Sequence, residues 1–366
     1  MTTSAPADPI VPYATPGGAP QGTPLRLASQ ERGWLSADPL LRAFTAAAAL
    51  CILGMIGVLV GVLFWSSIPS IKAFGFSFLY STEWRPNERE VPKRGPDGKV
   101  IMEDGETVME TLPPVFGAAA VIYGTTVSSA IAILLAVPLS FGASLFLVRI
   151  APKVLVAPVS FLIELLAAIP SIAYGMWGLF VLAPWLQRRE TWVFDHFSSI
   201  SWLGWLFNGI SPAGRDLLCG GLILGIMILP IITAISRDVL RTVPRAQLEG
   251  AVALGATWWQ SSREMLKFAR SALFGAVMLG LARAAGETMA VAMVIGNNPQ
   301  IVPSPFAPAQ TMSSLLANGY AEASAGVHVA ALSEVALILL LMSLGFNMVA
   351  RWLIVGKGGS RVSAAH

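Results

Sequence analysis

Charged residues are scarce in this chain. Asp, Glu, Lys and Arg together make up 12% of its 366 residues, whereas a typical soluble domain has about 25%. Hydrophobic residues make up 55%, and several apolar runs exceed about 18 residues, the length needed to cross a hydrocarbon core of ~30 Å. These features exclude an ordinary soluble globular protein and predict an integral membrane protein.

Cysteine and histidine are also rare. The two cysteines, Cys51 and Cys219, lie far apart in apolar runs, so we interpret both as small buried packing residues. The three histidines share no spacing typical of metal ligands, and we expect no metal site. The basic residues are spread over many short loops and form no block, so the sequence indicates no nucleic-acid binding.

Sequence motifs for catalysis are missing as well. The chain has no Gly-x-x-x-x-Gly-Lys-Ser/Thr sequence, which would form a loop that binds nucleotide phosphates. No combination of a nucleophile and a base is visible either. We therefore expect no catalytic residue and no cofactor in this chain, so any ATP hydrolysis that drives its function belongs to another polypeptide.

Hydrophobicity divides the chain into a membrane core and flanking segments. Residues 1–42 are rich in Pro, Gly, Ala and Ser, which predicts a disordered cytoplasmic tail. We assign the first transmembrane helix to residues 43–71, a five-helix core to residues 116–355, and a second cytoplasmic tail to residues 356–366. The six apolar runs lie at about 43–67, 121–148, 154–183, 217–236, 271–296 and 328–354.

The loops indicate the orientation of the chain. Lys and Arg are more frequent in the segments that are cytoplasmic when both termini are inside, which predicts that orientation. The outer segment 72–115 contains the turn signals Gly95-Pro96-Asp97-Gly98 and Asp104-Gly105, so we expect a small hairpin cap there. The outer segment 184–216 is rich in Trp and Phe, which favours an interfacial helix over an aromatic substrate site.

A cytoplasmic segment, residues 237–270, follows the fourth apolar run. Within it, small residues precede Gly255, and a glycine at a helix end permits the left-handed backbone of a sharp turn. The pattern predicts a short projecting helix that is suited to transmit force from a soluble partner. An ordinary amphipathic cytoplasmic helix is the alternative.

This segment resembles the Glu-Ala-Ala loop of ABC importer permeases, which docks on the ATPase subunit. Glu249, Ala251 and Gly255 match that pattern at the same spacing, and Gly250 stands where the family has its middle alanine. The later Ile-x-Leu-Pro of the family corresponds to Met265-Leu266-Lys267-Phe268, which lacks the proline. The resemblance implies that residues 249, 250, 251 and 255 couple the chain to an ATPase.

Two further segments resemble a narrower family. Residues 168–178 are similar to the third-span motif of phosphate permeases, and residues 283–297 to the fifth-span motif of PstC-type phosphate permeases. The resemblance covers roughly residues 115–355. It implies an all-α membrane protein with the type I ABC importer permease fold, located in the bacterial plasma (inner) membrane. It also implies three kinds of partner, which are a second permease of the PstA type, ABC ATPase subunits that use ATP, and an extracytoplasmic phosphate-binding protein.

Four residues are candidates for the substrate pathway. Arg283 and Glu287 are four apart in an apolar run, so on one helix they share a face. Ionisable groups at membrane depth are costly and usually mark a pathway. The Arg283 guanidinium suits phosphate oxygens, and Glu287 competes for it, which keeps anion binding brief. Pro170 breaks the third run and brings polar backbone, Ser171 and Tyr174 near the pathway.

Other interpretations stay open at this point. Arg283 and Glu287 form an intrahelical ion pair that only stabilises the bundle, or each pairs with a partner permease across an interface of small residues. Glu164 and Glu334 line the pathway or make polar packing contacts. The transported ion is inorganic phosphate, or else another oxyanion such as molybdate or sulfate. A membrane sensor that transports nothing is the remaining alternative.

Overall fold

The computed structural model describes residues 37–92, 102–103, 106–107, 109–197, 206–207, 209–323 and 326–358. The chain divides into two units, residues 1–59 and residues 60–366, and each is described by itself. Most of the expected N-terminal tail and the last residues of the C-terminal tail lie outside the described residues.

The described part of the first unit is one stretch of helix. It belongs to α1 (Ala37–Phe74), which begins inside the segment expected to be a tail. All its described side chains up to Leu59 are exposed, Cys51 included. The prediction that Cys51 is a buried packing residue is therefore wrong for this unit, whereas Cys219 is buried as predicted.

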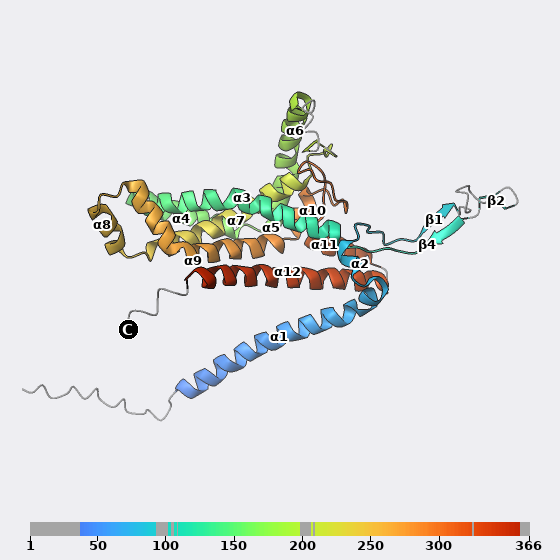
Figure 1. The fold of residues 1–366 in the computed structure, drawn as a ribbon, viewed down its shortest axis with the longest axis horizontal. Helices are drawn as coiled ribbons and strands as arrows, with labels where there is room; N and C mark the ends of the chain where they lie inside the picture. Colours follow the sequence, from blue (N-terminus) through green and yellow to red (C-terminus); the bar gives the residue numbers. More distant parts are fainter. Residues whose placement is uncertain are drawn as a thin grey trace, which may run out of the picture. The chain divides into compact units, whose positions relative to one another are not determined.

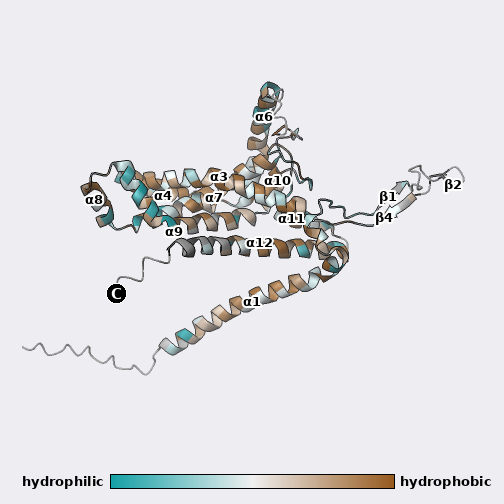
Figure 2. Ribbon diagram, viewed as in Figure 1, coloured by the Kyte–Doolittle hydropathy of each residue, from teal (hydrophilic) through white to brown (hydrophobic). Residues whose placement is uncertain are grey.

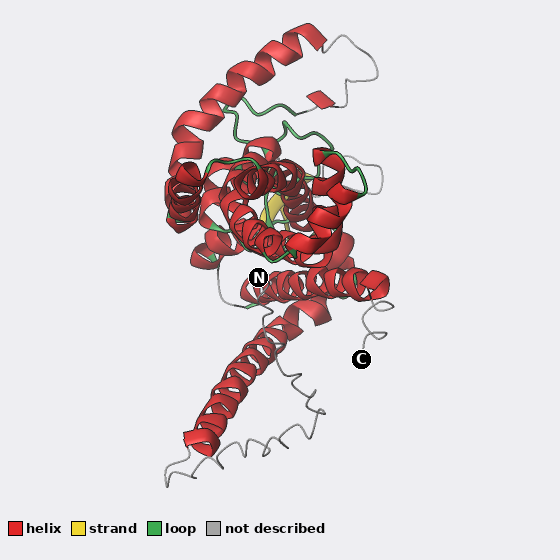
Figure 3. Ribbon diagram, turned by 90° about the vertical axis from the view of Figure 1, so that its left-hand side faces the viewer, coloured by secondary structure: helices red, strands yellow, loops and turns green. Residues whose placement is uncertain are grey.

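The second unit is almost entirely helical (Figure 1). Its helices are the end of α1, α2 (Ser77–Tyr80), α3 (Ala119–Arg149), α4 (Lys153–Ala168), α5 (Ser171–Trp177), the π-helical turn η1 (Gly178–Leu182), α6 (Ala183–Phe197), α7 (Leu217–Arg241), α8 (Arg245–Ala253), α9 (Trp258–Ala285), α10 (Met289–Val294), α11 (Met312–Glu322) and α12 (Val327–Gly358). Figure 3, drawn from one end of the bundle, shows several of its helices viewed along their axes.

Five described helices are long and apolar enough to cross a membrane, namely α1, α3, α7, α9 and α12. A sixth span forms if α4 and the helical segment Ser171–Phe197, which are bent by 89° at their junction, count as one. The predicted third span is therefore not one straight helix, because Pro170 lacks the N–H that would continue α4.

The predicted fifth span, residues 271–296, also has the wrong limits. A capping box between Thr257 and Gln260 starts α9 at Trp258, in the segment assigned to the cytoplasm. The helix then ends at Ala285, before the predicted span does. Figure 2 shows many hydrophobic residues along α3 and α7 and hydrophilic residues near α8.

Helix α7 forms the centre of the bundle. It packs against α3, α9 and α4, and its side chains Ile223, Ile228 and Ile232 are fully buried. Small residues permit this close packing. A Cβ added to Gly221 lies 2.6 Å from Ile131 Cγ2 of α3, so only glycine fits at that contact.

The outer segment expected to form a hairpin contains two nested antiparallel strand pairs. Strand β1 (Arg89–Pro92) pairs with β4 (Met109–Leu112), with Arg89 opposite Leu112. Between them β2 (Met102–Glu103) pairs with β3 (Glu106–Thr107).

Helix α6 covers the first part of the segment 184–216, which is rich in Trp and Phe. This helix projects away from the bundle (Figure 1). Trp185, Trp192, Phe194 and Phe197 of α6 are exposed. This exposure agrees with an interfacial helix. The predicted aromatics Trp202 and Trp205 lie outside the described residues.

A buried pair of carboxyl groups joins α6 to the start of α7. Glu190 of α6 is 4% exposed and Asp216 is 0% exposed. Asp216 precedes the first residue of α7 and caps it, because its Oδ1 accepts a hydrogen bond from Cys219 N at 2.7 Å. Burial, together with the neighbouring Glu190 carboxyl, raises the pKa of Asp216 to about 8. The folded chain therefore holds a proton at this pair that the unfolded chain releases.

This proton predicts a pH-dependent stability. Because the pKa of Asp216 is higher in the folded state, the free energy of unfolding falls as pH rises from 3.8 toward about 8. Asp216→Asn keeps an N-cap oxygen and removes the ionisation. At pH 8 we expect it to raise the midpoint of thermal unfolding by at least ~2 °C, and to have little effect at pH 4. The exposed Asp195→Asn on α6 is the matched control. Equal pH profiles for the parent and Asp216→Asn would contradict this assignment.

Candidate functional site

The helix that carries Arg283 breaks before Glu287. Helix α9 ends at Ala285, and α10 begins at Met289. Glu287 Oε1 accepts a hydrogen bond from Ala290 N of α10 at 3.3 Å. The Glu287 carbonyl oxygen accepts another from Ser313 Oγ of α11 at 2.6 Å. The break is thus held by the side chain of Glu287 on one side and by α11 on the other.

Arg283 and Glu287 have different surroundings at this break. Glu287 is 9% exposed, whereas Arg283, in the last turn of α9, is exposed. Among the described residues, Arg283 forms no hydrogen bond or ion pair. The predicted shared helix face is wrong because the helix ends between the two residues. The interpretation of an intrahelical ion pair that stabilises the bundle has no support in this geometry.

A second break lies at Pro170, between α4 and α5. Pro170 has no N–H to donate to the Leu166 carbonyl, four residues earlier. Tyr174 Oη donates to that carbonyl oxygen at 2.8 Å, and the Tyr174 side chain is 7% exposed. Ser171 is half-buried at the start of α5. The Leu166 carbonyl thus accepts hydrogen bonds from both the Tyr174 hydroxyl and the Ile169 N–H, the latter at 3.3 Å.

The two breaks are packed against each other. A Cβ added to Gly175 of α5 lies 2.9 Å from Ala290 Cα of α10. A Cβ added to Gly178 lies 2.9 Å from Val294 Cγ1 of α10. Arg283 is within electrostatic range of Tyr174. The structure thus brings together the two motifs at residues 168–178 and 283–297. The four predicted pathway residues lie at the two breaks.

Sequence reasoning missed the role of Arg237, which it counted only as a cytoplasmic positive charge. Arg237 of α7 is 7% exposed. Its Nη2 lies 3.1 Å from Glu164 Oε1 of α4 and 2.9 Å from Asp238 Oδ1. Glu164 therefore makes a cross-helix contact here. An acidic residue in an apolar run, such as Glu164, requires a partner of this kind. The presence of Glu164 in the third apolar run was therefore the signal that could have indicated a basic partner.

The predicted coupling segment forms an exposed corner of the bundle. Helix α8 has no buried residue; Glu249 and Gly250 are exposed, and Ala251 is half-buried. Gly255 has φ +83°, and Leu254 before it is 92% exposed. This corner lies at the opposite end of the bundle from α10 and α11 (Figure 1).

One continuous helix joins this corner to Arg283. Helix α9 has 28 residues, and a rise of 1.5 Å per residue gives it a length of about 40 Å. Its first turn follows the Gly255 turn, and its last turn carries Arg283. The Gly255 turn and the break before Glu287 therefore lie at opposite ends of a single helix.

The chain also matches a known protein family. A family model described as "Binding-protein-dependent transport system inner membrane component" matches residues 136–355. The chain belongs to this family. It is consequently a multi-pass inner membrane protein, and the predicted all-α membrane fold of the type I ABC importer permeases is confirmed.

Individual family members are similar over most of the chain. The phosphate transport system permease protein PstC of Mesorhizobium japonicum is 41% identical over 320 residues, which cover 87% of this chain and 90% of that protein. PstC of Xylella fastidiosa (strain 9a5c) is 39% identical, with 85% and 88% covered. PstC of Haemophilus influenzae is 38% identical, with 87% and 93% covered.

A solved structure is more distantly similar. The MetNI methionine ABC transporter, in an inward-facing conformation, has 20% sequence identity and a TM-score of 0.41. The match covers 64% of this chain and 93% of the MetNI chain.

The close contact between the two breaks predicts the effect of a single methyl group. Gly175→Ala places its Cβ against α10, and we expect it to lower the midpoint of thermal unfolding despite the better helix propensity of alanine. A cost of about 1–3 kcal/mol is typical of such overpacking. Gly142→Ala in α3, where no atom lies within 4 Å, should be neutral or stabilising. Unfolding of Gly175→Ala at or above the parent temperature would contradict the contact.

Proposed function

We propose that this chain is the transmembrane permease subunit of an ATP-binding cassette importer for inorganic phosphate in the bacterial plasma membrane. The family assignment supports a permease, and the similar proteins named as phosphate transport permeases support the substrate. The structural observation that carries the proposal is Arg283 at the break between α9 and α10, which is exposed and has no ion-pair partner in the described part of the chain.

An arginine in this position suits an anion that must pass and not remain. An unpaired charge at membrane depth is costly unless it faces water or a partner. Arg283 offers a planar set of donors that matches phosphate oxygens. Glu287 points into the protein and caps α10, so the guanidinium remains available. The negative charge of Glu287, four residues along the chain from Arg283, lowers the affinity of the site for the anion, and this favours release.

The same geometry indicates how the other proposed residues act. The backbone breaks at Pro170 and Gly286 interrupt two helices where they touch. Irregular backbone persists at membrane depth only where protein or water satisfies it. Ser171 and the Tyr174 ring then line the passage beside Arg283, with Tyr174 positioned by its bond to Leu166.

Transport of this kind requires partners. The chain has no nucleotide-binding loop and no catalytic residue of its own, so ATP is used by separate ATPase subunits. These dock on the exposed corner formed by Glu249, Gly250, Ala251 and Gly255. A second permease of the PstA type completes the passage, and an extracytoplasmic binding protein delivers phosphate. Both termini of this chain, and α8, then face the cytoplasm.

We expect Arg283→Ala to abolish most phosphate import. Loss of a charge-assisted hydrogen bond costs about 1.5–3 kcal/mol, which lowers uptake at least about tenfold. Arg283→Lys should be partly active because it keeps the charge and loses the planar donors. The measurement is uptake of labelled phosphate by the reconstituted complex.

Assembly and basal ATP hydrolysis should be unchanged in both variants. Arg188→Ala, an exposed arginine on α6, is the matched control and should transport normally. Normal uptake by Arg283→Ala would remove Arg283 from the passage. Inhibition of phosphate entry by molybdate or sulfate at lower concentration than unlabelled phosphate would instead indicate another oxyanion.

The coupling corner depends on the conformation of Gly255. Gly255→Ala forces a side chain into the φ +83° conformation, which costs roughly 1 kcal/mol or more, while no neighbouring atom lies within 4 Å. We expect the geometry of the turn between α8 and α9 to change. As a result, less phosphate should be taken up for each ATP hydrolysed. Gly326→Ala, at φ +99° before α12 with equally open surroundings, imposes the same strain elsewhere. An equal loss in both variants would show general destabilisation and no coupling role.

A further inference from the structure

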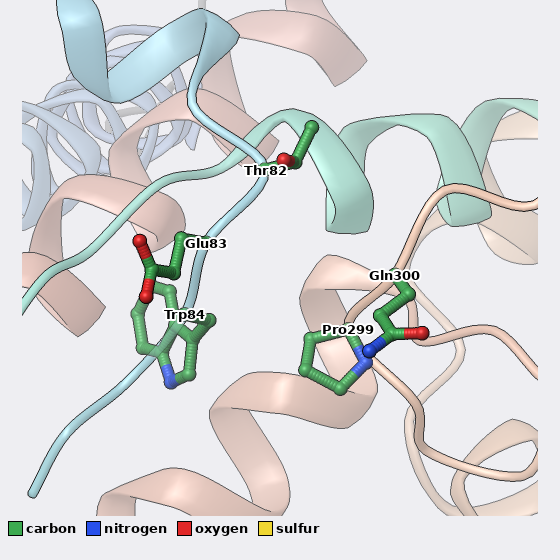
Figure 4. Close-up of a pocket in the computed structure, with 5 residues that line it drawn as sticks. All are labelled: Thr82, Glu83, Trp84, Pro299 and Gln300. Carbon is green, nitrogen blue, oxygen red and sulfur yellow. The ribbon is translucent and has the colours of Figure 1, made fainter. Parts of the chain in front are cut away.

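An open cavity lies at the end of the bundle opposite α8. It has a volume of about 410 Å³ and is lined by Thr82, Glu83, Trp84, Pro299 and Gln300 (Figure 4). The first three residues follow α2, and the other two follow α10. Figure 4 shows Glu83 and Trp84 on one side of the gap and Pro299 and Gln300 on the other. The volume is near the lower end of the range for ligand sites, which suits one long side chain.

The charge of the lining excludes an anion. Glu83 is a carboxylate, and no lining residue is a cation. The Glu83 side chain is 58% exposed, and its ion pair with Arg85 is long, at 3.7 Å. Exposed pairs of this kind contribute about 0–1 kcal/mol. Glu83 can therefore exchange Arg85 for an incoming cation, and phosphate has no attractive partner in this cavity.

The aromatic wall is held rigidly. The Trp84 ring lies 5.0 Å from that of Phe116 and 6.3 Å from that of His328, both edge-on. Paired hydrogen bonds between Arg85 and Val115 fix the backbone beside it. Indole rings attract cations within about 6 Å. A rigid ring beside a carboxylate is thus prepared to receive an ammonium or guanidinium group.

The opposite wall is attached to the candidate functional site. Pro299 and Gln300 follow a turn in which Gly296 has φ +93° and Asn297 has φ +53°. Asn297 Nδ2 donates to Ala292 O of α10 at 2.7 Å. An occupant of the cavity therefore contacts the segment that directly continues α10.

We propose that this cavity is an anchor site for one basic side chain, lysine or arginine, of an external protein partner. The proposal rests on the proposed function, in which an extracytoplasmic binding protein docks at this end. The charge of the surrounding segment supports it, because residues 72–115 contain eight acidic and six basic residues. The exposure of Glu83 favours a side chain presented from a protein surface over an enclosed small molecule.

The test uses the complete complex in nanodiscs with the purified phosphate-binding protein of the same transport system as the probe. Glu83→Gln keeps the shape of the cavity and removes its charge, and we expect about a fivefold or greater loss of affinity with a weaker salt dependence. Glu83→Lys should lose more, and Gln300→Glu should gain a few-fold. Glu88→Gln, exposed in the same outer segment, is the control and should bind as the parent does.

A charge exchange locates the partner residue. Each exposed Lys and Arg of the binding protein is changed to Glu, and we expect one change to restore binding to Glu83→Lys. Unchanged affinity in Glu83→Gln and Glu83→Lys would overturn the proposal.

Labelled uptake separates this proposal from the proposed function. If the parent complex imports phosphate and Glu83→Lys imports it equally well at limiting binding protein, the anchor site is wrong and the transport function stands. If the parent complex imports no phosphate, the proposed function is wrong. Binding of the probe to the parent and its loss in Glu83→Lys would in that case still support the anchor site.

Discussion

In hydrocarbon, every backbone polar group must find a partner inside the protein, and this constraint governs the centre of the molecule. Two helices are interrupted, and a side chain contributes a hydrogen bond at each interruption. Tyr174 donates to the Leu166 carbonyl, which also accepts from the Ile169 N–H, and Ser313 donates to the carbonyl of Glu287. These bonds help to satisfy the non-helical backbone at both breaks.

Small residues then bring the interruptions together, and a continuous helix links them to the α8 end of the bundle. Gly175 and Gly178 permit α5 and η1 to touch α10, while α9 runs unbroken from the Gly255 turn to Arg283. The Gly255 turn and Arg283 thus lie at opposite ends of the same helix, so the proposed coupling corner and the proposed anion contact both depend on α9.

The charged residues of the bundle differ in how buried they are and in whether they have a partner of opposite charge. Arg237 is buried and paired with Glu164 and Asp238, which joins α4 to α7. Arg283 is exposed and unpaired among the described residues. At the end of the bundle opposite α8, the cavity beside Glu83 has the opposite sign (Figure 4). The proposed anion contact at Arg283 and the proposed anchor site at Glu83 thus differ in the sign of their charge, so the two would not compete for one ligand.

The sequence alone determined the membrane location and the helical fold of the membrane core, because apolar run length and local motifs are properties of consecutive residues. It also indicated where Pro170 interrupts a span. Only the tertiary structure separated Arg283 from Glu287, since the end of α9 depends on contacts with α10 and α11. It likewise assigned Tyr174 to Leu166, paired Arg237 with Glu164, and formed the cavity between Glu83 and Gln300. These features join residues distant in sequence or depend on side-chain direction, which periodicity does not encode.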